Sequence, residues 1–152
     1  MNKKTGAIVG GIIILVIFLL VVGNKKTNQV VVSDTGAEIP CLPRGHQQVA
    51  QHIHPNLSII VDGVPEEIPA DIGIEGACMR EIHTHDTSGT IHIETAKLGT
   101  VYLLEDFFTV WNQPIERPGY NLVVTQDGEI VDPENLVLVD HAAIVLQYTS
   151  IE

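Results

Sequence analysis

Histidines and carboxylates are concentrated in two short stretches of this chain. The stretch 81–95, EIHTHDTSGTIHIET, holds three histidines, one aspartate and two glutamates, and the stretch 51–60, QHIHPNLSII, adds two more histidines. Two histidines separated by one residue on a β-strand send both rings to the same side, because side chains alternate between the two faces of a strand. Zinc binds combinations of imidazole and carboxylate, and imidazole also suits copper. The pattern therefore predicts a transition-metal site.

The upstream pair of histidines lies on an expected strand over 52–61. The odd positions of this strand are apolar, whereas its even positions carry His52, His54 and other polar residues. This alternation predicts that both imidazoles point away from the hydrophobic core. If the strand lies beside the segment 81–95, the two imidazoles can add to the ligands there.

The segment 80–95 is expected to form a hairpin whose loop decides which side chains meet. A two-residue loop places His83 opposite His92 and His85 opposite Thr90, with paired Cβ atoms ~4.5–5.5 Å apart. A three-residue loop would shift the register and split the set. The alternation of isoleucines favours the two-residue loop. The resulting polar patch, backed by isoleucines, consists of Glu81, His83, His85, His92 and Glu94.

We expect a copper or zinc ion to bind at this patch. The proposed ligands are His52, His54, His83, His85, His92 and Glu94. The competing interpretation is a histidine-rich surface or interface without a metal. Asp86 is expected to stabilise the turn by accepting backbone N–H groups. His46 and His141 lie outside the pattern and are interpreted as ordinary polar residues.

Two cysteines, Cys41 and Cys78, predict one disulfide if the domain is exported. The bond would join the segment before the first strand to the segment before the second hairpin. The rival interpretation is a thiolate metal ligand, with Met79 beside it.

The N-terminus carries an unbroken apolar run, Ala7 to Val22, between two pairs of lysines. Its length lies between a secretory h-region of ~7–15 residues and a membrane span of ~20. We expect an uncleaved membrane anchor over 1–24, a polar linker over 25–40 and an extracytoplasmic domain over 41–152. The alternative is a cleaved signal segment and a secreted domain.

The exported part of the chain is strongly acidic. From Asn28 onward it has four basic and nineteen acidic side chains, a formal charge of −15. Such a surface repels nucleic acid phosphates and attracts cations. We therefore expect no nucleic acid partner.

Several short strands and one helix are expected in the domain. Asp-Gly pairs at 62–63 and 127–128 predict hairpins. The apolar spacing in LLEDFFTVW (103–111) predicts the helix, and AAIVLQYT (142–149) predicts a buried last strand. This order predicts an α+β fold, a small mixed β-sheet with one helix, and suggests a ubiquitin-like β-grasp.

No catalytic signature in the sequence is complete. The metallo-β-lactamase pattern H-x-H-x-D-H fails at Thr87 and Ser88, and H-E-x-x-H, P-loop and G-x-S-x-G motifs are absent from the sequence. A metal-dependent hydrolase or oxidase remains an alternative, with Glu81 or Glu94 as the general base.

The segments HIHPNLSIIVDGVPEEIPADIGI, IHTHDTSGTIHIE and LLEDFFTVW, with Cys78, resemble a family of small exported bacterial and archaeal proteins. The family pattern is a cysteine, H-x-H-x-H-L, IP…IGI, a second cysteine, L-H-T-H-D-x-S-G-x-I-H-I-E and L-G-x-F-F-x-x-W. The chain departs from it at Asn56, where a third histidine stands in the family. The resemblance implies the histidine motif and no particular reaction.

These observations together predict a membrane-anchored extracytoplasmic protein that binds copper or zinc. The protein would capture, deliver or sense the metal, or it would be a subunit of a larger membrane complex. A structural docking module, whose histidine-bearing face binds a protein partner, is the second alternative.

Overall fold

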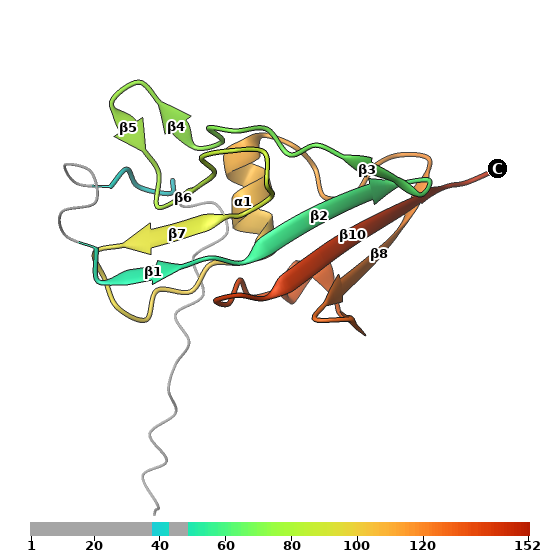
Figure 1. Ribbon diagram of the computed structural model, residues 1–152. Coiled ribbons are helices and arrows are strands. Elements are labelled where there is room, and N and C mark those ends of the chain that lie inside the picture. The colour runs from blue at the N-terminus through green and yellow to red at the C-terminus, as the bar shows by residue number, and fades with distance from the viewer. Residues whose placement is uncertain (1–37, 43–48) are drawn as a thin grey trace, which may run out of the picture.

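Short β-strands and one α-helix make up the described part of the chain, residues 38–42 and 49–152 of the computed structural model (Figure 1). The strands are β1 (Gln51–Ile53), β2 (Asn56–Val61), β3 (Val64–Glu66), β4 (Ile74–Glu75), β5 (Cys78–Met79), β6 (Ile82–His83), β7 (His92–Thr95), β8 (Tyr120–Gln126), β9 (Glu129–Ile130) and β10 (Ala143–Ser150). The helix is α1 (Leu104–Trp111), and a 3-10 turn, η2, covers Pro133–Asn135. Mixed sheets with one helix confirm the predicted α+β class.

The largest sheet has five strands in the order β3-β2-β10-β8-β9. Its two central strands, β2 and β10, run parallel, while every other neighbouring pair is antiparallel. Figure 1 shows these two strands side by side along the length of the sheet. β10 lies in the middle of the sheet, but the predicted burial holds for one face only: Ile144, Leu146 and Tyr148 are buried, whereas Ala143 and Gln147 are exposed.

Tight turns at the two Asp-Gly pairs close the outer hairpins of this sheet. Asp62 and Gly63 join β2 to β3, and Asp127 and Gly128 join β8 to β9. All four residues have positive φ, between 48° and 87°. Positive φ at both central positions is the backbone of a type I′ turn, which matches the right-handed twist of the strands. Both predicted hairpins are therefore confirmed.

The helix packs its apolar side into the core. Leu104, Phe107 and Phe108 are at most 1% exposed and belong to the same cluster of buried residues as Leu57 and Ile144 of the sheet. At the start of the helix, the N–H of Leu103 donates to the carboxylate of Asp106 at 2.7 Å. This bond satisfies one backbone donor that the first turn of a helix leaves without a partner.

The expected single strand over 52–61 is wrong, because the chain forms two strands there that join different sheets. β1 pairs with β7, whereas β2 pairs with β10 and β3. The break falls at His54 and Pro55, and proline lacks the N–H needed to continue a ladder. The break has a consequence for function, since it sends β1 into the sheet that carries the other histidines.

The second hairpin has the predicted register. β6 pairs with β7 so that Ile82 lies opposite Ile93 and His83 opposite His92. Together with β1 they form a second sheet in the order β1-β7-β6, with β7 in the centre.

The predicted two-residue loop of this hairpin is wrong, because the ladder ends at His83. Beyond it, the N–H of Thr84 donates to the carbonyl oxygen of Ile72 at 3.0 Å. On the return, the N–H of Leu57 donates to the carbonyl oxygen of Gly89 at 2.8 Å. The two arms of the loop thus bond to different neighbours and not to each other.

The apolar run Ala7 to Val22, and with it the predicted membrane anchor, lies outside the described residues. Within residues 38–42 and 49–152, no helix is long and apolar enough to cross a membrane.

Candidate metal centre

Six side chains from β1, β6, β7 and the adjoining loops gather in one cluster. Within it, two overlapping groups have ligand atoms that all lie within 4.8 Å of one another. The inner group consists of His83, His85, His92 and Glu94. The outer group consists of His52, His54 and His92. The structure therefore brings together all six residues that the sequence analysis proposes as ligands, and His92 belongs to both groups.

The central position of β7 explains this convergence. Its His92 pairs across the sheet with His83 of β6, and its Glu94 pairs with His52 of β1. His92 and Glu94 are two positions apart and share one face of β7, so both neighbouring strands deliver imidazoles to that face. The backbone direction at the end of β1 places the ring of His54 with its centroid 4.7 Å from that of His92.

The inner group is far more buried than a polar sheet surface. The side chains of His83 and Glu94 are 0% and 1% exposed, whereas His85 is exposed at the mouth. Gly73 packs closely against β6, since a Cβ atom at this position would lie 2.5 Å from the carbonyl oxygen of Ile82 and 3.3 Å from the Cβ of His83. Burying a carboxylate costs free energy unless it is paired or coordinates a cation. The burial of Glu94 among imidazoles is therefore an arrangement that a bound cation would stabilise.

A backbone hydrogen bond fixes the ring of His83. Its Nδ1 lies 2.9 Å from the carbonyl oxygen of Arg80. A carbonyl oxygen only accepts, so in the neutral ring Nδ1 carries the proton and Nε2 carries the lone pair. This is the hydrogen bond that metal-binding histidines commonly make through their second nitrogen.

The lone pair on Nε2 of His83 points into the cluster, where it accepts a hydrogen bond from Nε2 of His85. Nε2 of His83 lies 3.1 Å from Nε2 of His85 and 4.0 Å from Oε1 of Glu94. Ligand atoms around a tetrahedral zinc ion, each at ~2.0–2.1 Å, are ~3.3–3.4 Å apart. The two distances from Nε2 of His83 lie on either side of the spacing that one zinc ion requires.

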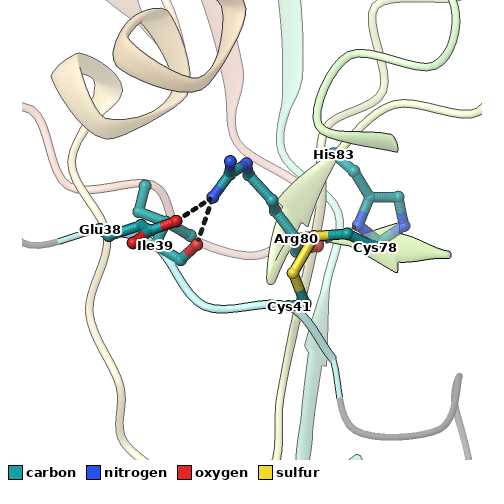
Figure 2. The surroundings of a disulfide bond; sticks show 6 residues. All are labelled: Glu38, Ile39, Cys41, Cys78, Arg80 and His83. Atoms are coloured by element: carbon teal, nitrogen blue, oxygen red, sulfur yellow. Dashed lines mark hydrogen bonds and ion pairs between the residues drawn. A yellow bond between two sulfur atoms is a disulfide. The ribbon is translucent and has the colours of Figure 1, made fainter. Parts of the chain in front are cut away.

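The disulfide Cys41–Cys78 is formed, as predicted, and it braces the strand that leads to the site (Figure 2). Arg80 follows Cys78 by two residues and pairs with Cys41 in a β-bridge. Its guanidinium donates to the carbonyl oxygen of Ile39 at 2.8 Å and lies 3.8 Å from the carboxylate of Glu38. These contacts hold the backbone of Arg80, whose carbonyl oxygen in turn orients His83.

The burial of two inner histidines keeps them uncharged. Desolvation lowers the pKa of His83 to about 4, although the Arg80 carbonyl opposes this shift. Burial, followed by the neighbouring His85 and His54, also lowers the pKa of His92. A histidine must be deprotonated to bind a metal ion. His83 therefore has a lone pair available well below neutral pH, and the shift in the pKa of His92 also favours its neutral, metal-binding form.

Glu81 was expected to share the patch, but its side chain has a different partner. The hydroxyl of Tyr102 donates a short hydrogen bond to Oε2 of Glu81. Burial, followed by this bond, raises the pKa of Tyr102. Only the backbone of Glu81 reaches the site, where its carbonyl oxygen accepts from the N–H of Glu94 at 2.8 Å.

The remaining polar residues of the prediction have separate roles. Asp86 accepts from the N–H of Ser88 at 2.8 Å, and this hydrogen bonding lowers the pKa of Asp86, as expected of a turn residue. His141 is 82% exposed and lies 3.4 Å from the carboxylate of Asp140. His46 lies outside the described residues.

Comparisons with known proteins do not assign a family or a function to this chain. No family model matches the chain, and neither a curated protein nor a solved structure gives a significant match. The resemblance to the small exported family therefore stays a prediction.

Proposed function

We propose that this protein binds one transition-metal ion, zinc or copper, through the inner group. The observation that carries the proposal is a buried carboxylate, Glu94, within 4.8 Å of the ligand atoms of three imidazoles. A set of three histidine nitrogens and one carboxylate oxygen satisfies zinc in its preferred tetrahedral geometry, and imidazole also suits copper.

The composition of the inner group favours metal capture, delivery or sensing over catalysis. Catalytic zinc sites usually have three protein ligands and keep one position for water or substrate, whereas the inner group offers four. Of the two glutamates considered as a general base, Glu94 is a ligand in this arrangement and Glu81 is held by Tyr102. A hydrolase or oxidase is therefore the weaker candidate.

An extracytoplasmic location, with the domain anchored to a membrane by residues 1–24, is part of the proposal. The disulfide supports it, because such bonds persist mainly in oxidising compartments. The acidic surface fits this proposal, because a negatively charged surface attracts cations from the surrounding solution. If the N-terminal segment is cleaved, the same domain is secreted.

The β-grasp assignment also belongs to this proposal. What supports it is the five-stranded sheet, in which the first and last strands, β2 and β10, run parallel in the centre. A hairpin strand flanks each of them, and α1 lies between the two hairpins in the chain. In such a fold β1, β6 and β7 would be an addition that carries the metal site.

Metal content measured on the full chain, purified without a histidine tag, tests the proposal. We expect at least one zinc or copper ion per chain after reconstitution, and one ion fewer in the His83→Gln/His85→Gln variant. A matched His141→Gln variant, which replaces an exposed histidine that belongs to neither group, should keep the ion. A chain that holds no ion under any of these conditions would contradict the proposal and favour a docking face for a protein partner.

A further inference from the structure

The outer group has a composition and an exposure different from those of the inner group. It contains three imidazoles and no carboxylate, and the side chain of His52 is 47% exposed. The rings of His52 and His54 have their centroids 4.3 Å apart, although the residues are two positions apart in the chain. Three convergent imidazoles at a surface are a recognised donor set for a divalent ion.

His92 lies between the two groups. Its ring centroid is 4.7 Å from that of His54 and 4.6 Å from that of His85, with edge-on geometry to both. Its Nδ1 is buried, and no group in the described part of the chain forms a hydrogen bond with it. A buried polar nitrogen without a partner costs free energy and calls for an explanation such as a bound ion.

Glu94 provides a second link between the groups. Its Oε1 lies 3.0 Å from Nε2 of His52 and 4.0 Å from Nε2 of His83. One carboxylate therefore stands between the two positions, where its negative charge would reduce the repulsion between two cations. A second carboxylate, Asp140, accepts from the backbone N–H of His54 at 2.8 Å.

We propose that the cluster is a two-ion centre, in which His92 bridges an inner and an outer ion. An imidazole ring has two nitrogens, so His92 can serve both groups at once only by giving one nitrogen to each ion. The neutral ring loses its one N–H proton to solvent when the second ion binds. This inference rests on the proposed function, because it requires the inner group to hold the first ion.

Copper titration of the metal-free full chain, followed by electron paramagnetic resonance, tests the inference. We expect two Cu²⁺ ions to be retained per chain after desalting. The first should give the spectrum of an isolated ion. The second should replace that spectrum by one of two exchange-coupled ions, because a bridging imidazole ring transmits the coupling.

Variants locate the second ion and the bridge. The His52→Gln/His54→Gln variant should retain one Cu²⁺ with an uncoupled spectrum, since its inner group is intact. The His141→Gln control should behave as the wild type. Two ions with independent spectra, or one ion in the wild type, would overturn the two-ion centre and leave the proposed function standing. A wild type that retains no copper and no zinc would overturn both.

Discussion

Nε2 of His52 lies 3.0 Å from Oε1 of Glu94, and the two residues face each other across the β1–β7 ladder. His52 is half exposed, whereas Glu94 is buried beside His83. This contact joins the surface of the metal cluster to its interior. It also means that an ion bound by Glu94 and an ion bound by His52 would influence each other through the same carboxylate.

Replacing Glu94 by glutamine should weaken metal binding strongly. The amide keeps the shape of the side chain but removes the negative charge and makes a poor ligand. We expect the affinity for Zn²⁺ to fall at least about tenfold, the size of loss typical even for residues that only support the ligands. Competition with a chromophoric chelator measures this affinity. The exposed Glu129→Gln variant on β9 is the matched control, and an equal loss in both variants would argue against Glu94 as a ligand.

The metal-free protein should lose stability as the pH falls from about 6.5 towards 4. Burial lowers the pKa of His83 to about 4 in the folded chain, whereas the unfolded chain keeps a value near 6.5. Between these pH values the unfolded state binds a proton that the folded state does not. The free energy of unfolding should therefore be lower at pH 4.5 than at pH 7 by about 2 kcal/mol. Urea unfolding at pH 7 and pH 4.5 measures the decrease. The decrease in the free energy of unfolding should be smaller in His83→Gln. An equal decrease in that variant would contradict the assignment of this pH dependence to His83.

Removing the disulfide should affect both stability and metal binding. Cys41 and Cys78 are separated by 37 positions, and closing a loop of this size contributes about 3–4 kcal/mol. The Cys41→Ser/Cys78→Ser variant should lose about that much in urea unfolding. Because the bond braces Arg80, which orients His83, we also expect weaker Zn²⁺ binding under conditions where the variant is folded. Unchanged affinity there would show that the brace is not needed.

Gly89 should not tolerate a side chain, unlike another glycine of similar backbone geometry. Gly89 and Gly63 both have positive φ, 78° and 82°. A Cβ atom at Gly89 would lie 2.1 Å from the carbonyl oxygen of Leu57, whereas at Gly63 nothing lies within 4 Å. We expect Gly63→Ala to cost about 1 kcal/mol and Gly89→Ala about 3 kcal/mol. Equal losses in urea unfolding would show that the close approach of this loop to β2 is not tight.

Local patterns in the sequence predict much of this molecule. The Asp-Gly pairs, the apolar face of 104–111 and the isoleucine alternation at 82, 91 and 93 are each decided by neighbouring residues, and the structure confirms the elements they predict. The register that sets His83 against His92 follows from the same alternation.

The depth of the site could not be predicted in this way. His83 and Glu94 read as one polar face of a hairpin, but both are buried, and the backbone at Gly73 packs closely against His83. The break at Pro55, which sends β1 to a different sheet from β2, also depends on tertiary pairing. No sequence motif predicts the supporting roles of Arg80 and Tyr102, because each residue acts through a tertiary contact.

X-ray absorption at the zinc edge, on the full chain loaded with one Zn²⁺, identifies the ligands of the ion. We expect nitrogen and oxygen ligands at ~2.0–2.1 Å, with the outer-shell scattering of about three imidazole rings and no sulfur at ~2.3 Å. A spectrum without imidazole scattering, or one that requires a sulfur ligand, would contradict the assignment of His83, His85, His92 and Glu94 as the metal site.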